Sequence, residues 1–284
     1  MTARLARAVG NSSLWRELSV RNPNHLLIGA GSALAFVVAA AAALGNGAER
    51  MEAIAVGVNI GVMVFLAWAV ARELDPDGSR SAFVAALLAA LLLIGGSGPA
   101  GAMVGILLAL RIVTRSTGKA PSRLDLALIL PLAAAFACLP RGWVGGAAMA
   151  AALVWDTRLP RPGGSRNLLG AAGTLAVALG VSFLRDTFGA GFRTPSALDW
   201  AAVAGAAVAF PAMRQYVPGA TGDRSRARLA PERLRAGRLL GLGAGLAAFL
   251  WFGGAAVGLL AGLWASLIGV AVYDRLIAPV TSPR

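Results

Sequence analysis

The stretch LLLIGGSGPAGAMV, residues 91–104, decides the fold because it interrupts a long apolar region at residues 82–113. A transmembrane helix needs about 20 apolar residues, so the region is too long for one span. Glycine and proline are typical of turns, and GGSGPAG at 95–101 therefore predicts a hairpin between two short helices. If the region formed one span instead, every later span would cross the membrane in the opposite direction.

Two other apolar regions carry the same kind of break. Residues 124–155 are interrupted by PRGW, and residues 236–273 are interrupted by WFGGAA. With the three hairpins and the clear runs at 26–45, 52–71, 167–184 and 198–213, the chain has about ten predicted spans. Half-helices that enter and leave on the same side are the alternative at each break.

The composition and the distribution of charge predict a membrane protein. The chain is 57% hydrophobic and only 14% charged, whereas soluble domains carry about 25% charged residues. With a cytoplasmic N-terminus, the predicted outer loops hold only Arg50, Arg141, Arg185 and Arg193 of the 26 Lys and Arg residues. By the positive-inside rule we expect an all-α polytopic membrane bundle of about 8–10 spans, with both termini cytoplasmic, in the plasma (inner) membrane.

The bundle is expected to cover residues 26–273, with a tail at 274–284 and an N-terminal segment at 1–25. In that segment, SLWRELSV at 13–20 places Leu14, Trp15 and Leu18 on one helical face. This pattern predicts a short helix lying on the bilayer surface, with a disordered basic arm as the alternative.

Part of the sequence repeats. PSRL at 121–124 and PERL at 231–234 each open a hairpin, which closes with VWD at 154–156 or VYD at 272–274. The related hairpins lie an even number of spans apart, so the pattern predicts a parallel internal repeat.

Counts of cysteine and histidine exclude several classes of site. The chain has one cysteine, Cys138, and one histidine, His25. An internal disulfide and a zinc site with several Cys or His ligands are therefore impossible within one chain. No nucleophile motif accompanies His25, so we expect a carrier more than an enzyme, and no cofactor unless the chain is an enzyme that uses Mg²⁺.

The stretch RELDPDGSRS at 72–81 holds the most suggestive carboxylates. Asp75 and Asp77 could share Mg²⁺ bound to a diphosphate, while Arg72 and Arg80 bind the remaining phosphate oxygens. The alternative is structural, because D-P-D-G is typical of a turn. The N-D-x-x-D motif of polyprenyl transferases is missing.

Asn59 is the notable polar residue inside a predicted span. Its amide either bonds a neighbouring helix or contacts a transported solute. The predicted spans hold no mid-span carboxylate or arginine, which favours an uncharged or amphiphilic solute over proton-coupled transport.

The basic loop at 214–238 contains Arg224, Arg226 and Arg228, which we expect to contact anionic lipid. A docking site for an acidic protein is the alternative. Nucleic acid is not expected, because the arginines lie in loops between apolar spans.

These patterns lead to three functional hypotheses. The first is a transporter or permease for a small uncharged or amphiphilic solute; the predicted topology is similar to that of drug/metabolite transporters, although the parallel repeat differs from their inverted one. The second is a membrane enzyme that uses Asp75, Asp77 and Mg²⁺ on a lipid phosphate or diphosphate at the cytoplasmic face. The third is a structural or partner-binding membrane protein.

Overall fold

The computed structural model describes residues 12–14, 21–94, 96–189, 191–215, 219, 221–222 and 228–273. The described part is a helical bundle in which no strand forms, only two isolated β-bridges. Its helices are α2 (Pro23–Gly45), α3 (Arg50–Leu74), α4 (Ser79–Leu93), α5 (Gly101–Thr114), α6 (Arg123–Ala137), α7 (Trp143–Asp156), α8 (Arg166–Leu184), α9 (Ala197–Gln215), α10 (Pro231–Phe252), α11 (Ala255–Leu259) and α12 (Ala261–Val272).

The helices end and restart at all three predicted breaks. GGSGPAG separates α4 from α5, PRGW separates α6 from α7, and WFGGAA separates α10 from the later helices. At the second break, a Cβ on Gly142 would lie 1.8 Å from the carbonyl oxygen of Phe136, so only glycine fits this turn. The third break contains the short helix α11, which the sequence did not predict.

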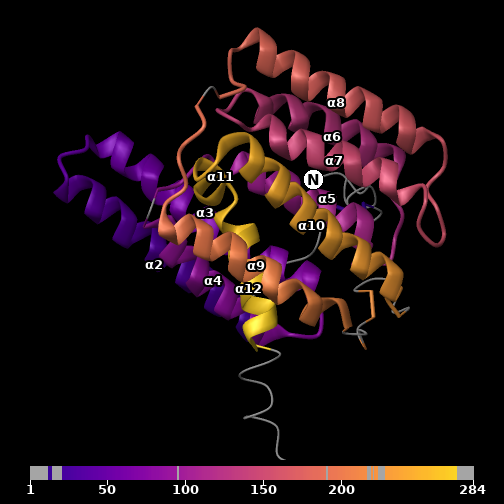
Figure 1. Ribbon diagram of the computed structural model, residues 1–284, viewed down its shortest axis with the longest axis horizontal. Helices are drawn as coiled ribbons and strands as arrows, with labels where there is room; N and C mark the ends of the chain where they lie inside the picture. Colours follow the sequence, from indigo (N-terminus) through magenta and orange to yellow (C-terminus); the bar gives the residue numbers. More distant parts are fainter. Residues whose placement is uncertain are drawn as a thin grey trace, which may run out of the picture.

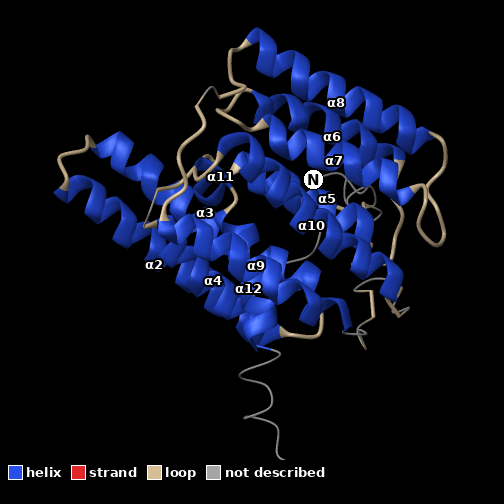
Figure 2. Cartoon of the chain, viewed as in Figure 1, coloured by secondary structure: helices blue, strands red, loops and turns tan. Residues whose placement is uncertain are grey.

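The helices form two groups around a central pair (Figures 1 and 2). Helices α6, α7 and α8 pack together on one side, and α3, α4, α9 and α12 pack together on the other. Helices α5 and α10 lie between these groups, and nearly every residue of α5 and α12 is buried. Where α5 meets α7, Gly105 and Gly145 bring the two backbones into contact, as is common for small residues in membrane bundles.

Three helices, α2, α3 and α8, are long and apolar enough to cross a membrane. The hairpin of α2 and the start of α3 projects from the rest of the bundle (Figure 1) and exposes large aliphatic side chains. Leu34 is 64% exposed and Val38 is 60% exposed. Apolar surface of this extent is unfavourable in water and suits a lipid environment.

Hydrogen bonds between helix ends define two ends of the bundle. The C-terminal ends of α5 and α7 and the N-terminal ends of α8 and α10 are bonded to one another, and we call this the arginine end. At the opposite end, Arg141 bonds the backbone of Thr187 and Arg193 bonds that of Phe252. The segments around Arg115, Asp156 and Arg233 therefore meet at one end, apart from those around Arg141 and Arg193.

Residues 12–14 of the N-terminal segment are buried against the bundle. The hydroxyl and backbone N–H of Ser13 each donate to Asp125 Oδ2 at 3.0 Å, and Arg111 donates to the carbonyl of Leu14 at 2.6 Å. Leu14 is 3% exposed and belongs to the core. Leu14 therefore packs against protein, while residues 15–20 of the predicted surface helix lie outside the described residues. Trp15 and Leu18 lie outside the described residues, as does the tail at 274–284.

Candidate functional site

The carboxylate of Asp75 stabilises the turn that follows α3. Its Oδ1 accepts a hydrogen bond from the backbone N–H of Gly78 at 3.1 Å, and its Oδ2 accepts one from the Ser81 hydroxyl at 2.8 Å. Asp75 is only 2% exposed. These contacts are those of a structural turn, which was the alternative interpretation of D-P-D-G.

The other two carboxylates of RELDPDGSRS point to different partners. Asp77 Oδ2 accepts from the backbone N–H of Gly219 at 2.8 Å. Glu73 pairs with Arg111 of α5 at 3.1 Å. Arg72 is half-buried and Arg80 is exposed. Among the described residues, no three Asp, Glu, His or Cys side chains come close enough to hold a metal ion.

Asn59 of α3 holds the loop between α4 and α5. Its Nδ2 donates to the carbonyl of Gly98 at 2.9 Å, and its Oδ1 accepts from the N–H of Ala100 at 2.9 Å. Its amide also reaches the Ser97 hydroxyl at 3.3 Å. The side chain therefore satisfies backbone groups at the start of α5, which is an interhelical structural role.

A buried ion cluster lies at the arginine end. Arg115 binds both carboxylate oxygens of Asp156, with Nε to Oδ1 at 3.1 Å and Nη2 to Oδ2 at 2.9 Å. Arg233 Nη1 donates to Oδ1 at 2.6 Å, and Asn167 Nδ2 donates to Oδ2 at 2.9 Å. The side chains of Asp156 and Arg233 are 0% and 4% exposed. Charge-assisted bonds of this kind orient both guanidinium groups rigidly.

Arg233 is also fixed by backbone carbonyls. Its guanidinium donates to the carbonyls of Pro160, Arg161 and Val113 at distances between 2.7 and 3.1 Å. Arg233 thus joins the start of α10 to the loop after α7 and to the end of α5. Burial lowers the pKa of Arg233; hydrogen bonding to Asp156 opposes this shift, and repulsion from Arg115 and Arg161 adds to it. An arginine remains protonated at neutral pH nonetheless.

A cavity of about 380 Å³ opens beside this cluster, and we call it the arginine pocket. It is formed by the loops that precede α6, α8 and α10, and its lining residues are Thr114, Arg115, Gly118, Pro160, Arg161, Arg228, Leu229, Ala230, Pro231 and Arg233. Within the described part of the chain, Asp156 is the only carboxylate bonded to any of its four arginines. The pocket therefore carries excess positive charge.

The four arginines differ in how firmly their guanidinium groups are held. Arg115 and Arg233 are fixed by Asp156, whereas Arg161 and Arg228 are exposed. The guanidinium groups of these last two have no hydrogen-bond or ion-pair partner among the described residues. Within the part of the chain that the structure describes, neither guanidinium would have to break an internal bond to bind an anion.

Two further features of the backbone favour an anion here. Helix α10 begins at the pocket, and no side chain caps its N-terminal end, where the helix dipole is positive. Arg115 and Arg161 both have left-handed backbones, with φ of 49° and 54°. This conformation costs about 1–2 kcal/mol in a residue other than glycine, and such strain is found at functional sites.

The sequence located this site only in part. It identified Arg228 as a lipid contact, and Arg228 lines the pocket; Arg224 and Arg226 lie outside the described residues. It placed Asp156 at the inner end of its span but did not pair it with Arg115 and Arg233. The signal in the sequence was the VWD motif, in which a carboxylate directly follows an apolar span.

The predicted repeat does not explain the site, because matching positions differ in environment. Arg233 of PERL is buried against Asp156, whereas Arg123 of PSRL is exposed. Asp274, the counterpart of Asp156, lies outside the described residues. No family model, curated protein or solved structure matches this chain.

Proposed function

We propose that this chain is an integral membrane protein that binds a phosphate-bearing lipid through the arginine pocket. The proposal is based on the charge of the pocket: four arginines line it, and among the described residues only one carboxylate, Asp156, is bonded to any of them. Guanidinium groups match the geometry of phosphate oxygens and bind them in pairs. This function combines the amphiphilic solute and the lipid phosphate of the first two sequence hypotheses.

Each arginine has a distinct role in the proposal. Arg233 and Arg115 are held in place by Asp156, so they supply a fixed positive field. Arg161 and Arg228 are exposed and make the direct contacts with the phosphate. The N-terminal end of α10, where the helix dipole is positive, lies at the same position and also favours an anion.

We also propose how the helices cross the membrane. About ten helices would span the plasma membrane, with α4, α5, α6, α7 and α12 as short members of hairpins. The arginine end would face the cytoplasm together with both termini, as the arginine-rich loops predict. The parallel repeat would be an ancestral feature of this arrangement. Anionic lipid of the inner leaflet would then lie beside the pocket.

Transport of an uncharged or amphiphilic solute is a second proposal. It is supported by the scarcity of charged residues within the predicted spans. A solute would have to pass through a cavity between helices, however, and no residue of α3, α6 or α9 lines the arginine pocket or the apolar groove between α7 and α10. Flux of labelled solute into liposomes containing the purified protein would test it. A partner-binding role would instead require a protein that co-purifies with the chain.

The direct test is the thermal stability of the detergent-purified full chain with phosphatidic acid, diacylglycerol, phosphatidylcholine or inorganic phosphate. A ligand that binds only the folded state stabilises it by about 2.7 kcal/mol at a concentration of 100 times its Kd. We expect stabilisation by phosphatidic acid and none by diacylglycerol. Stabilisation by inorganic phosphate alone would identify a soluble anion as the ligand.

Matched variants locate the binding. Arg161→Gln with Arg228→Gln removes the two free cations of the pocket. Arg123→Gln with Arg158→Gln removes two exposed arginines that do not line it, one at the start of α6 and one in the loop after α7. Loss of stabilisation in the first pair alone supports the proposal, whereas equal loss in both pairs would indicate attraction by net charge and would refute a specific site.

A further inference from the structure

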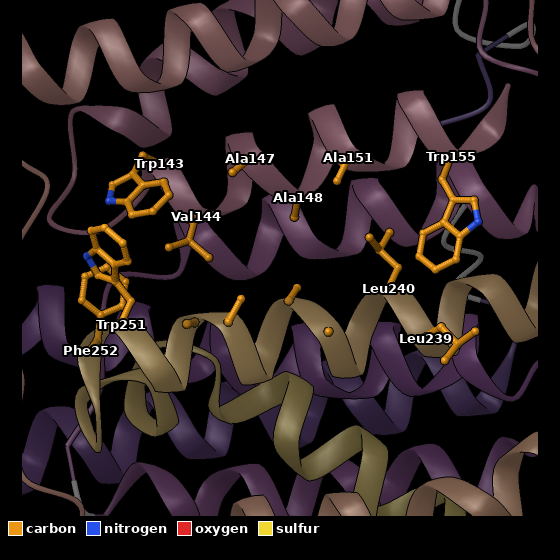
Figure 3. A pocket seen from close by; sticks show the side chains of 14 residues that line it. Trp143, Val144, Ala147, Ala148, Ala151, Trp155, Leu239, Leu240, Trp251 and Phe252 are labelled. Atoms are coloured by element: carbon orange, nitrogen blue, oxygen red, sulfur yellow. The ribbon is translucent and has the colours of Figure 1, made fainter. Parts of the chain in front are cut away.

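An apolar groove runs between α7 and α10 (Figure 3). Its volume is about 370 Å³. Trp143, Trp251 and Phe252 lie at one end, and Trp155 and Leu239 lie at the other (Figure 3). Between these ends the walls are alanine and glycine, with their small side chains, from both helices.

The groove is open along one side. Its floor is buried, as shown by Val144, Ala148 and Leu240, while Gly243 and Ala247 on its rim are exposed. A Cβ on Gly243 would meet no atom within 4 Å. The groove is therefore a real gap between the helices that a chain could enter from the side.

The same helices connect the groove to the arginine pocket. Leu240 on the groove floor lies seven residues after Arg233, so both are on one face of α10. On α7, Trp155 at the groove end directly precedes Asp156, which holds Arg233. The distance along α10 from Arg233 to Leu239 is about 9 Å at 1.5 Å per residue.

We propose that the α7–α10 groove holds a hydrocarbon chain of the same lipid whose phosphate binds in the arginine pocket. This inference rests on the proposed function and specifies the ligand as a long-chain lipid phosphate. Charge complementarity places the phosphate at the arginine end, and the apolar walls that continue from there match an alkyl or prenyl chain and no polar group.

The dimensions limit the occupant to one extended chain. The thirteen residues from Trp143 to Trp155 span about 18 Å of helix, which is a large part of a bilayer core of about 30 Å. A second chain of the same lipid would remain in the bilayer.

The test is photo-crosslinking of the full chain in detergent with phosphatidic acid that carries a diazirine in its acyl chain. Phosphatidylcholine with the same diazirine is the reference. We expect peptides of α7 and α10 that line the groove to be labelled by phosphatidic acid roughly tenfold more, the effect of one hydrogen bond to a charged group. Exposed apolar peptides of α2 should be labelled equally by both.

Gly243→Leu fills the groove without an initial clash. Gly180→Leu on α8 is its matched control, since Gly180 is also exposed, within a helix and free of neighbours within 4 Å. We expect Gly243→Leu to lose the groove labelling, Gly180→Leu to keep it, and both to remain stabilised by phosphatidic acid. Ala247→Leu, on the same rim, gives an independent repeat.

The outcomes separate the two proposals. Stabilisation by phosphatidic acid with no preferential labelling of the groove, or labelling unchanged by Gly243→Leu and Ala247→Leu, overturns the groove inference and leaves the arginine pocket in place. Neither stabilisation nor preferential labelling overturns both.

Discussion

Asp156 Oδ1 accepts a hydrogen bond from Arg233 Nη1 at 2.6 Å although the two residues are 77 positions apart in the chain. This contact joins the end of α7 to the start of α10. It also positions one wall of the arginine pocket, because Arg233 lines that cavity. The ion pair thus links the stability of the bundle to the shape of the candidate site.

Asp156→Asn should lower the free energy of unfolding by about 3–5 kcal/mol, because it leaves the buried guanidinium of Arg233 and the half-buried one of Arg115 without their counter-ion. Chemical denaturation in detergent measures the change. Glu232→Gln is the control, since it removes an exposed carboxylate in the first turn of α10 and should cost only about 0.3–1 kcal/mol. Equal losses would show that Asp156 has no special role.

Arg161→Gly should weaken binding of phosphatidic acid without lowering stability. Glycine removes the strain of about 1–2 kcal/mol that a left-handed backbone imposes on arginine. The greater freedom of glycine in the unfolded chain costs about 0.4–1 kcal/mol in return. Arg158→Gly, where φ is not positive, should be destabilising instead. A stability loss at Arg161 as large as that at Arg158 would contradict the role assigned to strain.

Gly105→Ala should destabilise the bundle by about 1–3 kcal/mol through overpacking. The new Cβ would lie 2.4 Å from the Cα of Gly145, and backbone atoms cannot move aside as a flexible side chain can. Gly180→Ala meets nothing within 4 Å and should be neutral or slightly stabilising. Thermal unfolding of the two variants side by side provides the measurement.

Asn59→Leu should cost about 0.6–2 kcal/mol of stability, since the Gly98 carbonyl and the Ala100 N–H lose their partner. Binding of phosphatidic acid should be unchanged. Reduced binding with unaltered stability would instead support Asn59 as a substrate contact.

Asp75→Ala should lower stability by about 0.5–2 kcal/mol, as the loss of a capping side chain does. The loss should be the same with and without Mg²⁺, because Asp75 bonds Gly78 and Ser81 in the turn. Stabilisation of the parent by Mg²⁺ with a polyprenyl diphosphate, absent in the variant, would restore the metal hypothesis for Asp75 and Asp77.

The sequence by itself determined where the three long apolar regions break into separate helices. The breaks at GGSGPAG, PRGW and WFGGAA could be read directly, because glycine and proline act on the local backbone whatever surrounds them. The single cysteine and single histidine likewise exclude whole classes of site, because a disulfide or a zinc site needs more such residues than the chain contains.

Only the tertiary structure decided which charges meet. Glu73 pairs with Arg111, 38 residues later in the chain. Asp156 pairs with Arg115 and Arg233, which are 41 and 77 residues away in the sequence. Sequence spacing predicts contacts within a helix, where neighbours lie three or four residues apart. Contacts between helices depend on how the helices pack, and that packing is set by close approaches such as Gly105 against Gly145, which no local pattern encodes.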